Sequence, residues 1–250
     1  MSITSQAYAK VISDLLPRVM EEQAPQVARA ADLITESVRN NGVIHAFGSG
    51  HSEVLAMEIA GRAGGLVPTN RLALRDIVLF GGEPASVLAA VTLERDPTVA
   101  RRILDLAPVR DGDVFVIASS SGVNGVIVEM ATLVKERGHG LIAITSLEHT
   151  GKVASRHPSG KRLCDLADVV LDNGAPYGDA ALPLPDGGAA GAVSSITAAA
   201  LAQMIVADVI GRLIDAGETP PVYLSSNIPG GDEHNNELEA RYAGRIRRGA

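Results

Sequence analysis

Residues 43–65 read VIHAFGSGHSEVLAMEIAGRAGG, and this stretch decides the fold. The apolar run 43–47 predicts a buried strand, which is followed at once by the small-residue loop Gly48-Ser49-Gly50-His51-Ser52. Beyond the loop, apolar positions recur about every 3.6 residues, which predicts a helix over residues 51–63. A strand, a glycine-rich turn and a helix in this order indicate the first half of a strand–helix–strand unit.

The loop 48–52 has the composition of an anion-binding turn. Glycine lets the backbone turn sharply and approach a ligand closely. The first turn of a helix has unpaired N–H groups at its partly positive end, and Ser49 and Ser52 add hydroxyl donors. A tight connection with a serine cap would have the same composition, so this loop alone does not decide between a binding and a structural role.

The composition of the 250-residue chain favours a folded α/β protein, either one large domain or two small ones. Apolar residues make up 46% and charged residues 20%, which is enough for a sizeable core. The 22 Lys and Arg against 29 Asp and Glu give a net charge of −7, which argues against nucleic acid or an anionic membrane as the main partner. The basic residues Arg245, Arg247 and Arg248 are expected to form a solvated helix end.

Other features predict a cytoplasmic protein without a metal or a cofactor. Cys164 is the single cysteine, which excludes an intrachain disulfide and suits a reducing compartment, and residues 1–10 lack the apolar core of a signal peptide. The run 189–211 is long enough to span a bilayer, but it is mostly alanine with polar residues inside it, so it is predicted as a buried helix. Histidines and carboxylates do not repeat at metal-ligand spacing, and the sequence has no dinucleotide-binding or P-loop pattern.

Strand and helix patterns alternate along the chain and predict a parallel sheet covered by helices. Residues 5–40 are helical in pattern, and Pro17 and Pro25 are expected to divide them into two or more pieces. Residues 173–192, rich in Gly, Pro and Ala, are expected to form a loop. A second strand is expected to begin at 66–67, and the other expected strands are 114–118, 141–144 and 169–171. The other expected helices are 85–93, 97–106, 126–137 and 194–214.

The chain is expected to be a single domain with three parts. These are an N-terminal helical extension, residues 1–42, a core domain, residues 43–216, and a C-terminal tail, residues 217–250, whose last helix covers about 236–248. His45 lies within the first strand and is expected to be a hydrogen-bonded histidine of the core.

A second loop of small hydroxyl residues repeats the first arrangement. Ser119-Ser120-Ser121-Gly122-Val123-Asn124 follows the apolar strand 114–118, and Thr145-Ser146-Leu147-Glu148-His149-Thr150 follows the strand 141–144. In a parallel sheet these loops and the loop 48–52 fall on the same edge, where ligands bind if the winding reverses. The sequence therefore predicts an anion pocket there.

The two loops 48–52 and 119–124 resemble those of the sugar isomerase (SIS) domain family, and the resemblance extends over residues 5–215. In the family pattern Ser-x-Ser-Gly-x-Ser/Thr, Ser119, Ser121 and Gly122 match, and Asn124 departs. The resemblance implies a flavodoxin-like five-stranded parallel sheet with helices on both faces, a phosphorylated sugar as ligand, and a homodimer or larger homo-oligomer. It implies a phosphate held by Ser52, Ser119 and Ser121 in a cradle with Gly48, Ser49, Gly50, Gly122 and Asn124.

The segment Met57-Glu58-Ile59-Ala60-Gly61-Arg62 is similar to the Ala-Glu-Leu-x-Gly-Arg stretch of phosphoheptose isomerases, in which the glutamate is the catalytic base. The resemblance implies aldose–ketose isomerisation through a cis-enediol with Glu58 as base. The alternative is a surface Glu58 paired with Arg62 four residues on. Those isomerases place a histidine on the late helix, whereas the helix 194–214 has none, and Gln203 is its nearest polar candidate.

Two histidines are candidates for the missing acid. His51 lies in the first loop, where it would either donate to the phosphate or act as the acid. His234 lies in Gly230-Gly231-Asp232-Glu233-His234-Asn235. The isomerase domain of glucosamine-6-phosphate synthase is similar in placing a C-terminal tail over the sugar, which implies a lid over the same or a neighbouring subunit's site. A solvated loop with an asparagine cap is the alternative.

Two other functions remain open. Gly81-Gly82-Glu83 with Ala90–Glu94 is similar to a region of N-acetylmuramic acid 6-phosphate etherases, which implies elimination and hydration by paired glutamates, here Glu58 and Glu94. The other alternative is a non-catalytic phosphosugar sensor. Such sensors often carry a DNA-binding segment, and residues 1–40 contain no Arg- or Lys-rich recognition helix, which disfavours this alternative.

Overall fold

Strand β1 (Ile44–Gly48) is formed by the apolar run that the sequence predicts, and all of its residues are buried. It lies in a five-stranded parallel sheet of order β2-β1-β3-β4-β5 in the computed structural model, which describes residues 3–90 and 92–247. The winding reverses between β1 and β3, because β2 lies on one side of β1 and β4 on the far side of β3. This order confirms the predicted flavodoxin-like sheet. The other strands are β2 (Thr69–Leu72), β3 (Val114–Ala118), β4 (Gly140–Thr145) and β5 (Val169–Asp172).

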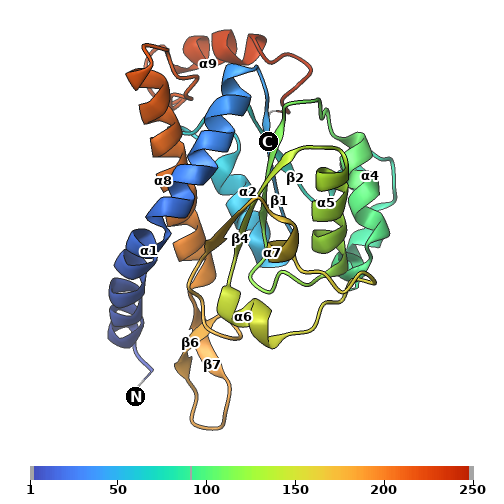
Figure 1. The fold of residues 1–250 in the computed structure, drawn as a ribbon, viewed down its shortest axis with the longest axis vertical. Helices are drawn as coiled ribbons and strands as arrows, with labels where there is room; N and C mark the ends of the chain where they lie inside the picture. The colour runs from blue at the N-terminus through green and yellow to red at the C-terminus, as the bar shows by residue number, and fades with distance from the viewer. Residues whose placement is uncertain (1–2, 91, 248–250) are drawn as a thin grey trace.

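Helices cover both faces of the sheet, as predicted (Figure 1). Side chains alternate between the faces of a strand. Ile44 and Ala46 pack in one core with α1 (Ser5–Arg39), α2 (Glu53–Ile59) and α8 (Ser194–Asp215). Phe47 packs in the other core with α4 (Thr98–Leu106) and α5 (Gly125–Glu136). Three short helices lie in the connections: α3 (Asp76–Leu79), α6 (Leu147–Lys152) and α7 (Leu163–Leu166).

Helix α1 is continuous, so the prediction that Pro17 and Pro25 divide it is wrong. A proline removes one N–H and leaves a carbonyl one turn earlier without its partner. Both prolines are exposed, so water can satisfy those carbonyls. On the opposite side, buried residues such as Val19, Val27 and Ile34 pack in the core shared with α8 and hold the helix together.

Two of the predicted helices have different boundaries. Helix α2 ends at Ile59 rather than at residue 63, because Gly61 and Gly64 adopt positive φ. The last helix is α9 (Gly231–Ala240), which begins five residues before the predicted start, because Gly230 adopts a left-handed cap and acidic residues follow in the first turn. The segment around His234 is therefore helix and not loop.

Two other segments were also predicted incorrectly. An α-helix is expected over 85–93, but the described residues of this segment form the 3₁₀ turn Ala85–Ala89 and the start of a second one, Leu93–Arg95. Only a few of their partly buried side chains, such as Val87, pack on the core. The expected loop 173–192 contains an antiparallel hairpin, β6 (Ala180–Pro183) and β7 (Ala189–Ala192). Its turn includes Gly187 and Gly188, both at positive φ, a hairpin signal that the loop prediction overlooked.

Helix α8 is the one helix of the described chain that is long and apolar enough to cross a membrane. Its buried residues, among them Leu201, Ile205 and Val209, belong to the core beneath α1 and α2. This packing identifies α8 as a core helix, in agreement with the predicted buried helix.

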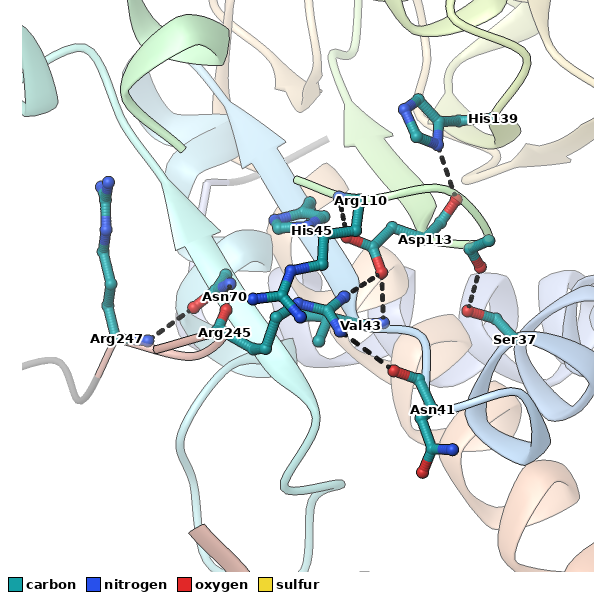
Figure 2. Close-up of polar contacts among 11 residues, drawn as sticks. Ser37, Asn41, Val43, His45, Asn70, Arg110, Asp113, His139, Arg245 and Arg247 are labelled. Carbon is teal, nitrogen blue, oxygen red and sulfur yellow. Dashed lines mark hydrogen bonds and ion pairs between the residues drawn. The ribbon is translucent and has the colours of Figure 1, made fainter. Parts of the chain in front are cut away.

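A buried carboxylate organises the amino-terminal edge of the sheet (Figure 2). Asp113 accepts hydrogen bonds from the backbone N–H groups of Val43 and Arg110, both at 2.8 Å, and from His45 Nε2 at 3.0 Å. Arg245 is the fourth partner, and its Nη2 forms an ion pair with Asp113 Oδ1 at 2.6 Å. Burial raises the pKa of Asp113, but the hydrogen bonds from His45, Arg110 and Val43 outweigh it, so its pKa lies below the ordinary value.

His45 is a core histidine, as predicted. It stacks on Phe115 with ring centroids 5.0 Å apart. Burial lowers the pKa of His45 below its ordinary value of 6.5, although the hydrogen bond to Asp113 opposes this effect. The imidazole is therefore neutral at pH 7 and donates through Nε2, while its buried Nδ1 finds no hydrogen-bond partner in the described chain.

The C-terminal segment 241–247 is attached to the same edge. Asn70 on β2 donates to the carbonyl of Arg245 and accepts from the N–H of Arg247, each at 2.7 Å. Arg245 is buried, so the expected solvated helix end is wrong for this residue, because Asp113 needs a cation that solvent cannot replace. Arg248, which belonged to the same prediction, lies outside the described residues.

Acidification is expected to destabilise the fold through His45. Because the folded pKa is lowered, the stability contribution is present above about pH 6.5 and is lost as the pH falls below it. The variant His45→Gln can still donate to Asp113 but cannot be protonated. Between pH 7 and 5 the wild type should lose up to about 1.4 kcal/mol per pH unit more than the variant in urea unfolding. If the free energy of unfolding has the same pH dependence in the wild type and in His45→Gln, the buried imidazole is not neutral at pH 7.

Candidate functional site

A cavity opens at the carboxyl-terminal edge of the sheet, beside the reversal between β1 and β3. The loop after β1, the loop after β3 and the first turns of α8 enclose it. Its apolar wall is formed by side chains such as Leu55, Ile144 and Ala198. The polar residues that line it are His51, Ser52, Ser119, Ser120, Asn173, Ser194 and Ser195.

The first loop folds back over the end of β1, and this brings His51 and Ser52 to the cavity. A Cβ atom at Gly48 would lie 2.3 Å from the carbonyl oxygen of Ser52, and Gly50 adopts a φ of 57°. These glycines are therefore required by the close packing of the loop on itself. Ser49 does not line the cavity, and its hydroxyl donates to Glu94 Oε2 at 3.2 Å.

The second loop is tied to the end of β4. Ser119 is buried, its Oγ accepts from the N–H of Gly122 at 3.1 Å, and its carbonyl accepts from Thr145 Oγ1 at 2.7 Å. Gly122 adopts a φ of 64°, and a Cβ atom at this position would lie 3.2 Å from the hydroxyl oxygens of Thr145 and Thr150. These contacts hold Ser119 in place with its hydroxyl proton still available for a ligand.

The structure brings only part of the predicted phosphate cradle to the cavity. Ser52 and Ser119 line it, whereas Ser121, Gly122 and Asn124 do not. Thr150 Oγ1 donates to the carbonyl of Ser121, and Asn124 Oδ1 accepts from Arg156 at 3.2 Å. Together with Gly48 and Gly50, these residues shape the loops.

Glu58 lies beside the cavity, one turn further along the same two helices. Leu55 on α2 and Ala199 on α8 line the cavity, and Glu58 and Gln203 follow them by one turn. Gln203 Nε2 donates to Glu58 Oε1 at 2.7 Å. Arg62 binds the same oxygen, so the expected pair four residues apart is present. Glu58 is half-buried between the helices.

His234 is not brought to the cavity within one chain. Its Nε2 donates to the carbonyl of Val222 at 3.0 Å, and its helix α9 packs through Leu238 on Val43 and Val67, which precede β1 and β2. The tail therefore covers the amino-terminal edge of its own sheet, at the opposite end from hairpin β6–β7 (Figure 1).

The sequence did not point to four of the polar residues that line the cavity. Asn173 follows β5 directly, so applying the strand-end argument to the fifth strand would have found it. Ser120 occupies an unspecified position of the family pattern. Ser194 and Ser195 open α8, where Asp179 accepts from both the N–H and the hydroxyl of Ser194 at 2.8 Å. Within residues 3–90 and 92–247, no group of three His, Cys, Asp or Glu side chains is placed to hold a metal ion.

A doubly wound sheet with hydroxyl-bearing loops at its reversal point defines a class of α/β proteins with a ligand site at that edge. The model of the SIS domain matches residues 7–146, more than half of the sequence, and the chain therefore belongs to the SIS domain family. A UPF0309 protein of Listeria innocua is 38% identical over 240 residues, 96% of both chains. A UPF0309 protein of Halalkalibacterium halodurans is 39% identical over 236 residues, 94% of this chain and 96% of the relative.

Solved structures confirm the fold. The phosphoheptose isomerase of Neisseria gonorrhoeae superposes with a TM-score of 0.51 at 20% identity and covers 83% of this chain and 100% of its own. The phosphoheptose isomerase of Francisella tularensis superposes with a TM-score of 0.51 at 17% identity over 82% of this chain and 100% of its own. The SIS resemblance that rested on the two serine loops is thereby confirmed.

Replacing Gly48 by alanine should damage the site and the fold together. The added Cβ would collide with the backbone carbonyl of Ser52, which cannot move without unfolding the loop. We expect Gly48→Ala to lower the free energy of unfolding by about 3 kcal/mol in urea titrations. Gly211→Ala is the matched control, because its Cβ meets open space in α8 and should stabilise the protein by about 0.5–1 kcal/mol. A Gly48→Ala variant as stable as the wild type would refute the packing argument.

Proposed function

We propose that this SIS protein binds a phosphorylated sugar in the cavity and interconverts its aldose and ketose forms. One observation carries the proposal: hydroxyls from both loops at the winding reversal, Ser52 and Ser119, line one cavity beside the half-buried carboxylate of Glu58. Phosphate oxygens accept hydrogen bonds, which these hydroxyl groups can donate.

Glu58 has the geometry of a held base. Gln203 and Arg62 both donate to Oε1, so Oε2 is the oxygen left for proton transfer. In the proposed reaction, Oε2 removes the proton from the carbon next to the carbonyl and returns it to the neighbouring carbon of the enediol. Gln203 cannot transfer a proton, so its role is to position the carboxylate. His51 is the imidazole that lines the cavity and the proposed acid, and His234 has no part within one chain.

The variant Glu58→Gln tests the proposal. It keeps the shape of the side chain and removes the base, so turnover should fall by about 10³-fold while phosphosugar binding is retained. Turnover is measured as exchange with D₂O of the proton next to the carbonyl, which is a C1 proton of fructose 6-phosphate and sedoheptulose 7-phosphate and the C2 proton of glucosamine 6-phosphate.

Glu22→Gln, on the exposed side of α1, is the matched control and should leave turnover unchanged. Unchanged turnover in Glu58→Gln would eliminate Glu58 as the base. Tight binding without turnover of any sugar by the wild type would favour the sensor alternative.

A second carboxylate supports one alternative reaction. Glu94 Oε2 accepts from Ser49 in the first loop and lies near Gly50. A pair of carboxylates near the sugar is what an elimination of the N-acetylmuramic acid 6-phosphate etherase type would need. If the wild type releases lactate from N-acetylmuramic acid 6-phosphate and Glu94→Gln does not, the protein is a lyase. Exchange with D₂O of the proton next to the carbonyl without release of lactate, retained in Glu94→Gln, would establish the isomerase.

The homo-oligomer implied by the family resemblance stays a prediction, as does a cytoplasmic location. Val54 and Met57 on α2 and Ile196 on α8 are exposed apolar side chains on two helices that pack together beside the cavity, which supports a partner surface there. A lid over a neighbouring subunit's site by the tail 217–250 likewise stays a prediction.

A further inference from the structure

Asn173 is a buried amide whose donor is unused. The residue is 2% exposed, follows β5 directly and lines the cavity. Its N–H donates to the carbonyl of Thr145 at 2.8 Å, and its Oδ1 accepts from the N–H of Ala175 at 3.0 Å. Because the oxygen is held by its own loop, the amide Nδ2 is the atom left for the cavity, and it makes no hydrogen bond in the described part of the chain.

The turn itself does not require an amide. A carboxylate would accept the N–H two residues on equally well, as the adjacent Asp172 does with Gly174 at 3.0 Å. An asparagine adds only the NH₂ group, which the turn does not use and which can donate to a ligand oxygen.

A second unpartnered group lines the same cavity. The hydroxyl of Ser120 is enclosed and has no hydrogen-bond partner in the described chain. Ser120 and Asn173 come from different loops, yet both leave a donor free in one small space. Two unused donors in one cavity indicate a ligand with several acceptor oxygens.

The order of the strands indicates which part of a ligand Asn173 would meet. Strand β4 lies between β3 and β5, so Asn173 is two strand spacings, about 10 Å, along the edge from Ser119. A phosphate held by Ser52 and Ser119 is too small to reach it. On the basis of the proposed function, we propose that Asn173 Nδ2 donates to an oxygen of the sugar and thereby selects phosphosugars of six or more carbons over shorter phosphates.

The test compares Asn173→Ser with the wild type by calorimetric titration. Serine can accept the N–H of Ala175 and so keep the turn, but it is too short to reach the sugar. The probes are inorganic phosphate, glycerol 3-phosphate, fructose 6-phosphate, glucosamine 6-phosphate and sedoheptulose 7-phosphate. Asn235→Ser is the matched control, because Asn235 is equally buried and both of its amide groups are bonded to Leu224 at the other edge of the sheet.

The wild type should bind at least one of the six- or seven-carbon phosphates more tightly than inorganic phosphate. Asn173→Ser should weaken that binding about tenfold and leave the Kd of inorganic phosphate and glycerol 3-phosphate unchanged. Asn235→Ser should lower the Tm without changing any Kd. The assignment is overturned if Asn173→Ser binds the long phosphosugar as the wild type does, or if it loses affinity for all probes equally. A wild type that binds none of the probes would overturn the proposed function, and this inference with it.

Discussion

The buried Asp113 carboxylate is the interaction on which the architecture depends. Its four donors come from the start of β1, from β1 itself, from the turn before β3 and from the C-terminal segment, so one charge joins parts of the chain more than 200 residues apart. A buried charge is tolerated only when it is fully bonded, and removal of one partner leaves the rest uncompensated. The amino-terminal edge of the sheet is therefore closed by contacts between distant segments of the chain.

The two edges of the sheet have opposite character. At the amino-terminal edge, α9 and the segment 241–247 cover the strands, and Asp113 has its hydrogen bonds satisfied. At the carboxyl-terminal edge, Ser120 and Asn173 keep unused donors around a cavity. Donors that face a cavity can be satisfied by a ligand, so Ser120 and Asn173 mark a binding site at this edge, whereas the C-terminal segment covers the other edge.

Local patterns were sufficient for the sheet and for part of the site. The apolar runs at β1 and β3 predicted buried strands of a parallel sheet. The SIS resemblance of the serine loops after them implied the flavodoxin-like sheet and selected Ser52 and Ser119, which line the cavity. Contacts between distant segments were not predictable: nothing near Ser49 shows that its hydroxyl binds Glu94, and nothing near Arg245 shows that it is buried against Asp113. The continuity of α1 was not predictable for a related reason. Its two prolines are tolerated because they are exposed, and which side of the helix is exposed depends on tertiary packing.

The burial of Arg245 also affects the order of events during synthesis. Val43, His45 and Asp113 lie in the first half of the chain, but their cation is residue 245. While the ribosome still holds that residue, the nascent sheet carries a carboxylate that it cannot enclose without an uncompensated charge. The amino-terminal edge of the sheet can therefore close around Asp113 only after Arg245 has left the exit tunnel.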